Sequence, residues 1–213
     1  MNKRTLGSEG LMTSELGFGC MGLNHHRGPV KDRNEMMKVV QHAFDAGVTM
    51  FDTAEVYGPY TNEELVGEAI QTFRKEIQLA TKGGFNITGN SNYPDSSKET
   101  LRNSLEGSLK RLRTDYIDLY YIHRVDPNIP IEEVAQTMQE FKKEGKILHW
   151  GLSEASAETI RRAHHIEPLA AVQSEYSIWW RELEKEVIPT LEELKIGLVA
   201  YSPLGRGFLT GKL

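Results

Sequence analysis

The chain has 213 residues and a formal net charge of -5 at pH 7, with 39% hydrophobic and 26% charged residues. This ordinary balance with an acidic excess argues against nucleic acid as a partner, because phosphate binding needs clustered Lys and Arg. A single cysteine excludes an intrachain disulfide. The sequence shows no apolar run suited to a membrane span or signal peptide, so we expect a cytoplasmic protein. We expect one domain, residues 1–213.

Short apolar strands alternate with helix-spaced stretches along the chain. A small hairpin is predicted over residues 4–14, and seven strands follow at 16–20, 48–51, 77–80, 116–122, 147–150, 170–172 and 198–200. Six helices alternate with them, around 36–44, from 61, after 97, from 130 to 145, near 155–165 and near 182–195. Thr61 followed by Glu64 predicts a capping box, and Pro189 must kink the last helix or lie near its first turn.

Strict alternation indicates parallel strands joined by right-handed crossovers, which fits a doubly wound sheet or a (β/α)8 barrel. In a barrel, the residues directly after the strands share the C-terminal rim, where barrel active sites lie. Polar or ionisable residues follow most of the predicted strands: Asp52, Lys82, His123, Ser153, Glu154, Gln173, Glu175, Tyr201 and Ser202.

A single Asp or His at a strand end is usually a cap or a satisfied hydrogen bond, but four convergent groups indicate a site. These four are Asp52, Lys82, His123 and, in the loop after the second strand, Tyr57. They form no metal-ligand pair such as HxxxH, and a lysine among them disfavours a metal, so we expect none.

The four side chains suit acid–base chemistry on a carbonyl. A free tyrosine has a pKa of about 10, and a lysine ammonium beside it favours the phenolate. A carboxylate keeps that lysine charged, and an imidazole can donate a hydrogen bond to a developing oxyanion. The set can therefore protonate a carbonyl oxygen while another group supplies hydride.

Several patterns in the sequence are interpreted as structural. Gly17–Gly22 reads GxGxxG, but the next helix is expected only from about residue 34, so the Rossmann fingerprint is rejected. The sequential pairs His25-His26 and His164-His165 lack ligand spacing and are interpreted as surface. Lys110–Arg113 is interpreted as an exposed helix end, and Trp179-Trp180 either packs on the next helix or forms a wall of the cleft.

Six ordered motifs, DTAEVYG, LATKGG, YYIHRVD, GLSEAS, VQSEYS and YSPLGRG, resemble the aldo-keto reductases, in particular their bacterial open-substrate branch. The resemblance covers about residues 3–212. It implies a (β/α)8 TIM barrel that binds an extended NADP(H). It also implies a catalytic tetrad of Asp52, Tyr57, Lys82 and His123, in which Tyr57 donates the proton.

The resemblance further implies the cofactor contacts. Ser153 and Gln173 would hydrogen-bond the nicotinamide carboxamide, and Tyr201 would stack on the ring. Many members carry Asn in place of Glu154, and a carboxylate there can accept from the carboxamide but cannot donate. The other implied cofactor residues are Gly19, Cys20, Met21, Asp52, Ser202, Pro203, Leu204, Gly205 and Arg206.

The resemblance implies an NADPH-dependent reductase that converts aldehydes or ketones to alcohols. Because the sequence stops after the seventh predicted strand, we expect the eighth strand and the C-terminal helices to be absent from this chain. Self-association through the open barrel edges is a further expectation. The alternatives are an inactive or cofactor-binding-only truncated barrel, and an aldolase that forms a Schiff base through Lys82. The expected partner is a small carbonyl compound, with neither nucleic acid nor membrane.

Overall fold

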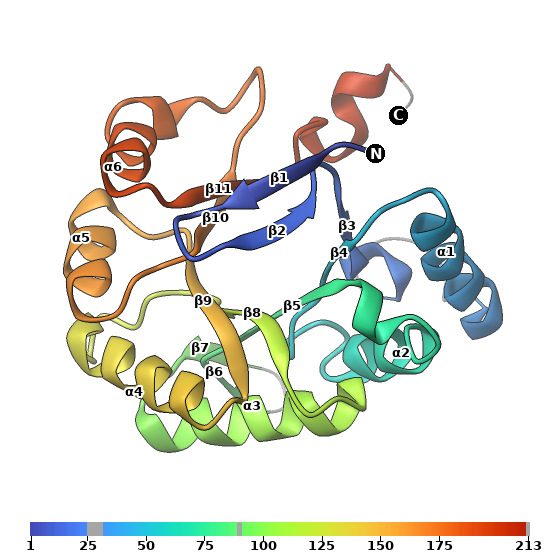
Figure 1. The fold of residues 1–213 in the computed structure, drawn as a ribbon, viewed down its shortest axis with the longest axis horizontal. Helices are drawn as coiled ribbons and strands as arrows, with labels where there is room; N and C mark the ends of the chain where they lie inside the picture. The colour runs from blue at the N-terminus through green and yellow to red at the C-terminus, as the bar shows by residue number, and fades with distance from the viewer. Residues whose placement is uncertain (25–31, 89–90, 212–213) are drawn as a thin grey trace.

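The computed structural model describes residues 1–24, 32–88 and 91–211. Over these ranges, seven parallel strands form one curved sheet with helices along its outer side (Figure 1). In order across the sheet the strands are β3 (Gly17–Gly19), β4 (Met50–Asp52), β5 (Gln78–Gly83), β8 (Ile117–Ile122), β9 (Ile147–Ser153), β10 (Ala171–Glu175) and β11 (Gly197–Tyr201). This order follows the chain without reversal, which excludes the doubly wound alternative and confirms the barrel-type arrangement.

Helices follow the strands where the spacing predicts them. They are α1 (Arg33–Asp45), α2 (Thr61–Ala69), α3 (Lys98–Leu112), α4 (Ile131–Lys143), α5 (Ala157–Ile166) and α6 (Val187–Leu194). Short 3-10 turns add η1 (Cys20–Leu23), η2 (Arg74–Glu76), η3 (Glu182–Glu184) and η4 (Gly205–Thr210). Pro189 is the third residue of α6, inside its first turn, where a proline costs no hydrogen bond. Within the described ranges, no helix is long and apolar enough to cross a membrane.

The predicted capping box at the start of α2 is wrong. Thr61 is the first helical residue, and Tyr60, with φ of 69°, precedes it as a cap without a side-chain hydrogen bond. The Thr61 hydroxyl instead donates to the carbonyl oxygen of Gly58 at 2.8 Å. The sequence pattern therefore locates the helix, but the side chain stabilises the loop before it.

The core has one layer on each side of the sheet. The outer layer lies between strands and helices and includes Phe51, Tyr120 and Trp150, all fully buried. The inner layer fills the barrel interior with Leu6, Leu11, Met50, Ala80, Leu119, Tyr121, Ala170 and Ala171. Its first two members come from the predicted hairpin, β1 (Lys3–Leu6) and β2 (Leu11–Ser14), which lies across the amino ends of the strands (Figure 1).

The alternation of side chains along the strands also determines which residues point into the barrel at the carboxyl ends of the strands. Successive side chains of a strand alternate between faces, so residues two apart point the same way. Met50 and Ala80 point inward, and Asp52 and Lys82 therefore also point inward, one step nearer the carboxyl ends. Ala171 places Gln173 in the same manner. A second hairpin, β6 (Phe85–Thr88) with β7 (Ser91–Pro94), follows β5 and was not expected from the sequence.

Candidate active site

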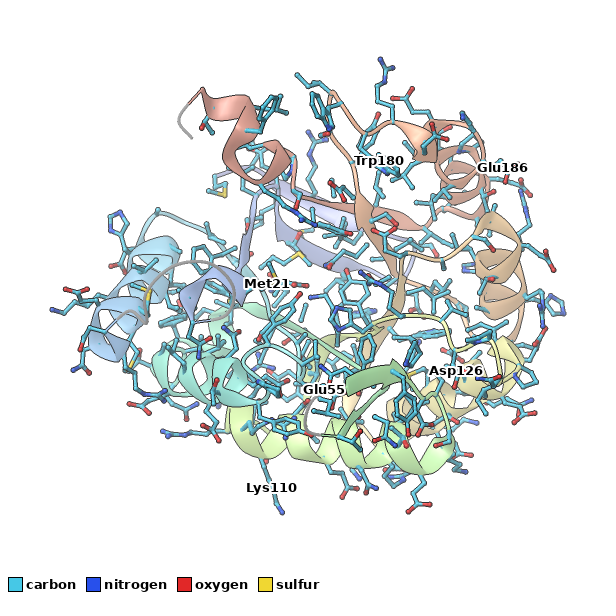
Figure 2. All side chains as sticks on the ribbon, turned by 180° about the vertical axis from the view of Figure 1, so that it is seen from behind. Met21, Glu55, Lys110, Asp126, Trp180 and Glu186 are labelled. Carbon is cyan, nitrogen blue, oxygen red and sulfur yellow. The ribbon has the colours of Figure 1, made fainter. Side chains whose placement is uncertain are left out.

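A cleft of about 970 Å³ lies at the carboxyl ends of the strands. Figure 2 views the molecule from the side opposite the β1–β2 hairpin, with Met21 of the cleft near the middle. The cleft is lined by Gly19, Met21, Gly22, Asp52, Val56, Tyr57, Pro59, Phe85, Asn92, His123, Arg124, Ser153, Gln173, Tyr201, Ser202 and Arg206. Its volume lies at the upper end of the range for small-molecule sites, about 300–1,000 Å³.

Lys82 lies beneath the cleft wall and joins its acidic and phenolic groups. Its side chain is 1% exposed and forms an ion pair with Asp52. Its Nζ also donates to the Thr53 carbonyl oxygen at 2.9 Å and to the Tyr57 hydroxyl at 3.3 Å. Burial disfavours the ammonium, but the Asp52 carboxylate and Tyr57 outweigh it, and the pKa of Lys82 is raised. The lysine is therefore charged and held in one orientation.

The second oxygen of Asp52 accepts a hydrogen bond from Gln173 Nε2 at 2.8 Å. Strand β4 thus connects with β10, four strands away in the sheet order, across the barrel interior. Tyr57 lies in the loop after β4, where its backbone N donates to Ala54 O at 3.1 Å and its carbonyl accepts from Asn62 N at 3.2 Å. These bonds fold the loop back so that the phenol reaches the lysine.

His123 follows β8 and faces Tyr57, with the two ring centroids 5.8 Å apart in an edge-on arrangement. The ring of Phe85 contacts His123 in a similar way at 5.2 Å. Burial, followed by the charges of Lys82 and Arg124, lowers the pKa of His123 to about 2. The imidazole is therefore neutral, and its Nδ1 is buried without a partner among the described residues. Nε2 is the nitrogen that can meet a ligand.

The far side of the cleft carries groups of a different kind. Ser153 and Gln173 are nearly buried at the ends of β9 and β10, and Tyr201 ends β11. Burial and the nearby Glu154 carboxylate raise the pKa of Tyr201 to about 12, so its phenol stays protonated. A Cβ added at Gly19 would meet nothing within 4 Å, which leaves open space beside β3. Polar donors and an aromatic ring therefore line the cleft at β9, β10 and β11, and open space lies beside β3.

The family model for the aldo/keto reductase family matches residues 15–213. The chain belongs to this family. Its members generally catalyse NAD(P)H-dependent carbonyl reduction.

Relatives in the aldo/keto reductase family agree in sequence and in structure. The "Probable aldo-keto reductase 1" of Glycine max is 49% identical over 212 residues, which are 97% of this chain and 60% of that protein. An aldo-keto reductase of Bacillus halodurans, in its holo form, superposes with a TM-score of 0.90 at 34% identity, covering 98% of this chain and 68% of the other. A glycerol dehydrogenase of Gluconobacter oxydans superposes with a TM-score of 0.90 at 33% sequence identity, covering 99% of this chain and 66% of the other. The chain thus spans about 60% of the length of the soybean relative.

The structure gathers most residues that the aldo-keto reductase resemblance selected. Asp52, Tyr57 and His123 line the cleft above Lys82, and Gly19, Met21, Ser153, Gln173, Tyr201, Ser202 and Arg206 line it too. Five implied cofactor residues lie outside that lining: Cys20, Glu154, Pro203, Leu204 and Gly205. Cys20 is the first residue of η1 and is fully buried, and burial raises the pKa of its thiol. Glu154 accepts from the backbone N of Glu175 at 2.9 Å.

Six cleft residues were not among those predicted for the site: Phe85, Asn92, Arg124, Gly22, Val56 and Pro59. The first two come from the β6–β7 hairpin, whose signal is the Gly-Asn dipeptide at 89–90 between two short runs. Arg124 directly follows His123, and its Nη1 donates to the His123 carbonyl oxygen at 2.6 Å and to Ser153 Oγ at 3.1 Å. Its place in the motif IHRVD was visible, but its orientation was not.

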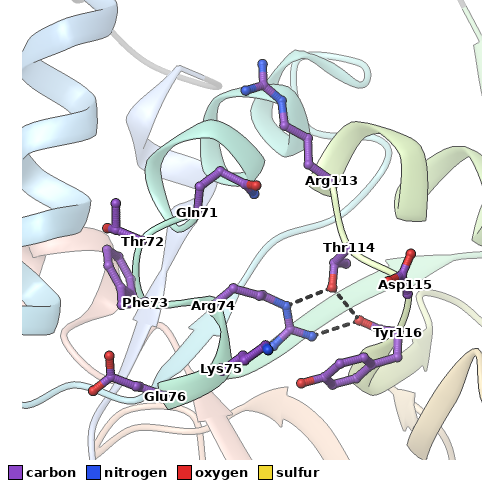
Figure 3. Close-up of a pocket in the computed structure, with 10 residues that line it drawn as sticks. All are labelled: Gln71, Thr72, Phe73, Arg74, Lys75, Glu76, Arg113, Thr114, Asp115 and Tyr116. Atoms are coloured by element: carbon purple, nitrogen blue, oxygen red, sulfur yellow. Dashed lines mark hydrogen bonds between the residues drawn. The ribbon is translucent and has the colours of Figure 1, made fainter.

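A second hollow, of about 440 Å³, lies at the amino ends of β5 and β8 (Figure 3). Arg74 crosses it, donating to Thr114 Oγ1 at 3.0 Å and to the Tyr116 carbonyl oxygen at 2.7 Å. The same guanidinium pairs with Asp118 at 2.8 Å. These bonds occupy the arginine in joining two loops, and we interpret this hollow as structural.

Other sequence interpretations are resolved by contacts. Arg111 was expected at an exposed helix end, but its Nε pairs with the buried Glu63 at 2.7 Å. His164 Nδ1 accepts from the backbone N of Leu169 at 3.0 Å, which gives it a structural role. Trp179 is 67% exposed and its ring contacts Phe208, so it neither packs on the next helix nor lines the cleft. The pair at 25–26 lies outside the described residues.

Proposed function

We propose that the chain is the catalytic part of an NADPH-dependent reductase that converts aldehydes or ketones to alcohols. The observation that carries this is the position of one buried ammonium, Lys82, between the carboxylate of Asp52 and the hydroxyl of Tyr57 at a cleft wall. A charged lysine beside a phenol makes proton release to a substrate oxygen easier. No packing requirement explains a carboxylate, an ammonium and a phenol meeting inside a barrel.

The residues of the cleft fit a nicotinamide cofactor. Ser153 and Gln173 offer hydrogen bonds suited to a carboxamide, the Tyr201 ring offers a stacking surface, and Arg206 supplies a cation suited to a phosphate. When bound, NADPH supplies hydride to the carbonyl carbon. Our preference for NADPH over NADH comes from resemblance to the family's open-substrate branch.

Within this proposal, Tyr57 gives its proton to the carbonyl oxygen, and Lys82 stabilises the charge that remains on the phenol. Asp52 keeps Lys82 charged and in place. His123, neutral because its pKa is low, donates from Nε2 to the same oxygen in the tautomer that carries its proton there. Phe85 and Val56 are apolar residues of the wall and limit water around the reacting carbonyl.

The Schiff-base alternative is disfavoured by the same geometry. An aldolase lysine must attack as a neutral amine, whereas the raised pKa of Lys82 keeps it protonated. Borohydride in the presence of a carbonyl compound should therefore leave Lys82 unmodified by mass spectrometry.

The test is NADPH consumption by the purified chain with a panel of aromatic and aliphatic aldehydes. Tyr57→Phe should abolish turnover and keep NADPH affinity within about twofold, because only the reacting hydroxyl is lost. Tyr116→Phe, which removes a phenol at the opposite end of the barrel, is the matched control and should retain turnover. Equal turnover in Tyr57→Phe would contradict the proposal, and NADPH binding without any turnover would indicate a binding-only chain.

A further inference from the structure

Glu55 is a buried carboxyl group that the proposed mechanism does not use. It lies two residues before Tyr57 in the loop after β4 and is 2% exposed. It does not line the cleft. Figure 2 labels it inside the ring of helices, near the middle of the molecule.

The contacts of Glu55 join three segments of the site. Its carboxylate accepts from the backbone N of Phe85 at 3.3 Å and from Ser104 Oγ of α3 at 3.0 Å. Its backbone N donates to the carbonyl oxygen of Lys82 at 3.1 Å, and its own carbonyl accepts from Tyr60 N at 2.8 Å. One residue thus connects the loop that carries Tyr57 with the end of β5 and with α3.

This connection reaches reacting groups through Phe85. The Phe85 ring lines the cleft and contacts His123 edge-on at 5.2 Å, and the His123 ring in turn faces Tyr57 at 5.8 Å. A shift of the Phe85 backbone therefore changes the surroundings of the imidazole. Glu55 holds that backbone by its N–H.

The charges facing Glu55 do not neutralise it. Glu63 of α2 is a second buried carboxylate, and it takes the guanidinium of Arg111 of α3 in a direct ion pair. Tyr120 of β8 presents a buried hydroxyl to the same cluster. Burial is the largest effect on Glu55, and its pKa is raised to about 7. Glu55 consequently changes charge near neutral pH.

We propose that Glu55 is a positioning residue for the reductase reaction, and that its ionisation fixes Phe85 and, through it, His123. The inference rests on the proposed function for its catalytic consequence. A carboxylate accepts stronger hydrogen bonds than a neutral carboxyl group, so the ionised form holds the Phe85 N–H and the Ser104 hydroxyl more firmly. Protonation loosens this connection and misplaces the imidazole.

The experiment compares pH profiles of kcat between pH 5.5 and 8.5 for wild type, Glu55→Gln and Ser104→Ala, with Glu64→Gln as the control for loss of an exposed carboxylate on α2. Wild type should show a step of about fivefold centred near pH 7, higher at the alkaline side. Glu55→Gln should lack the step and keep the low-pH rate throughout, while NADPH affinity stays within about twofold.

Ser104→Ala keeps the test decisive if the glutamine variant folds poorly. The Ser104 hydrogen bond favours the ionised form of Glu55, so its removal should move the step to higher pH. Glu64→Gln should keep the wild-type profile. A step that persists unchanged in Glu55→Gln, or that does not move in Ser104→Ala, would overturn the proposal.

A second readout separates this inference from the proposed function. The low pKa of His123 means that its ring does not itself titrate near pH 7, so its NMR signals report a neighbour. In wild type these signals should shift with a midpoint near pH 7, and in Glu55→Gln they should not. If the chain shows no turnover, the reductase proposal fails, and this shift alone decides: its presence supports Glu55 as the positioning group, and its absence overturns it.

Discussion

Gly83 ends β5, directly after Lys82, at a position where a side chain has no room. A Cβ there would overlap the hydroxyl oxygen of Tyr120 and lie 2.9 Å from Tyr120 Cζ and 3.0 Å from Ser104 Cβ. Optimal carbon contacts are about 3.5–4.0 Å, and Tyr120 is fully buried, so neither partner can retreat easily. Overpacking in a core costs about 1–3 kcal/mol, and we expect Gly83→Ala to lose about 3 kcal/mol of unfolding free energy.

Tyr120→Phe provides the matched background for this test. The Tyr120 hydroxyl is buried without a hydrogen-bond partner in the described ranges, so its removal should leave stability unchanged or raise it by about 1 kcal/mol. In that background Gly83→Ala should cost only about 1 kcal/mol, because the two carbon contacts remain. Urea denaturation of the four proteins gives the coupling, expected at about 2 kcal/mol. An equal cost of Gly83→Ala in both backgrounds would refute the overlap.

Three further predictions concern the buried ionisable groups, each measured by urea denaturation. Asp52→Asn should lower the free energy of unfolding by about 3 kcal/mol, because it leaves the Lys82 ammonium, 1% exposed, without its carboxylate. Asp45→Asn on α1 is the exposed control. A similar small loss of stability in both variants would contradict this prediction. Glu55 binds its proton more tightly in the folded than in the unfolded chain, so stability should fall as pH rises from about 4.5 to about 7. Between pH 5 and 8, wild type should lose roughly 3 kcal/mol more unfolding free energy than Glu55→Gln. Equal losses in the two proteins would contradict the prediction. For His123 the dependence of stability on pH runs in the opposite direction. Its pKa is lowered from 6.5 to about 2, so stability should fall as pH drops below 6.5, by about 2 kcal/mol at pH 5. His123→Gln should lack this fall.

The sequence predicts the sheet well because its signals are local. Apolar runs between helix-spaced stretches locate all seven strands of the curved sheet, and Ser97 and Gly145 mark a helix start and a helix end. The site residues follow from the same logic, since parallel strands deliver Asp52 and Lys82 to one end of the barrel. Alternation along each strand then decides that both point inward.

What the sequence does not predict depends on contacts between distant residues. Arg111 lies in the basic run 110–113 near the end of α3, and only the fold brings it to Glu63, 48 residues earlier. Glu55 lies inside the motif DTAEVYG, but its carboxylate accepts a hydrogen bond from Ser104 of α3, 49 residues later. The β6–β7 hairpin has strands of four residues each, too short for a periodic signal, and Phe85 was missed with it.

The most direct test of the central claim is transfer of hydrogen from cofactor to product. The purified 213-residue chain is incubated with an aromatic aldehyde and NADPH that carries deuterium at both C4 positions of the nicotinamide, and the alcohol is analysed by mass spectrometry, with Tyr57→Phe as the control. We predict alcohol that carries one deuterium on its carbinol carbon with wild type, and no alcohol with Tyr57→Phe. Alcohol formed equally by both proteins, or without deuterium, would contradict the account.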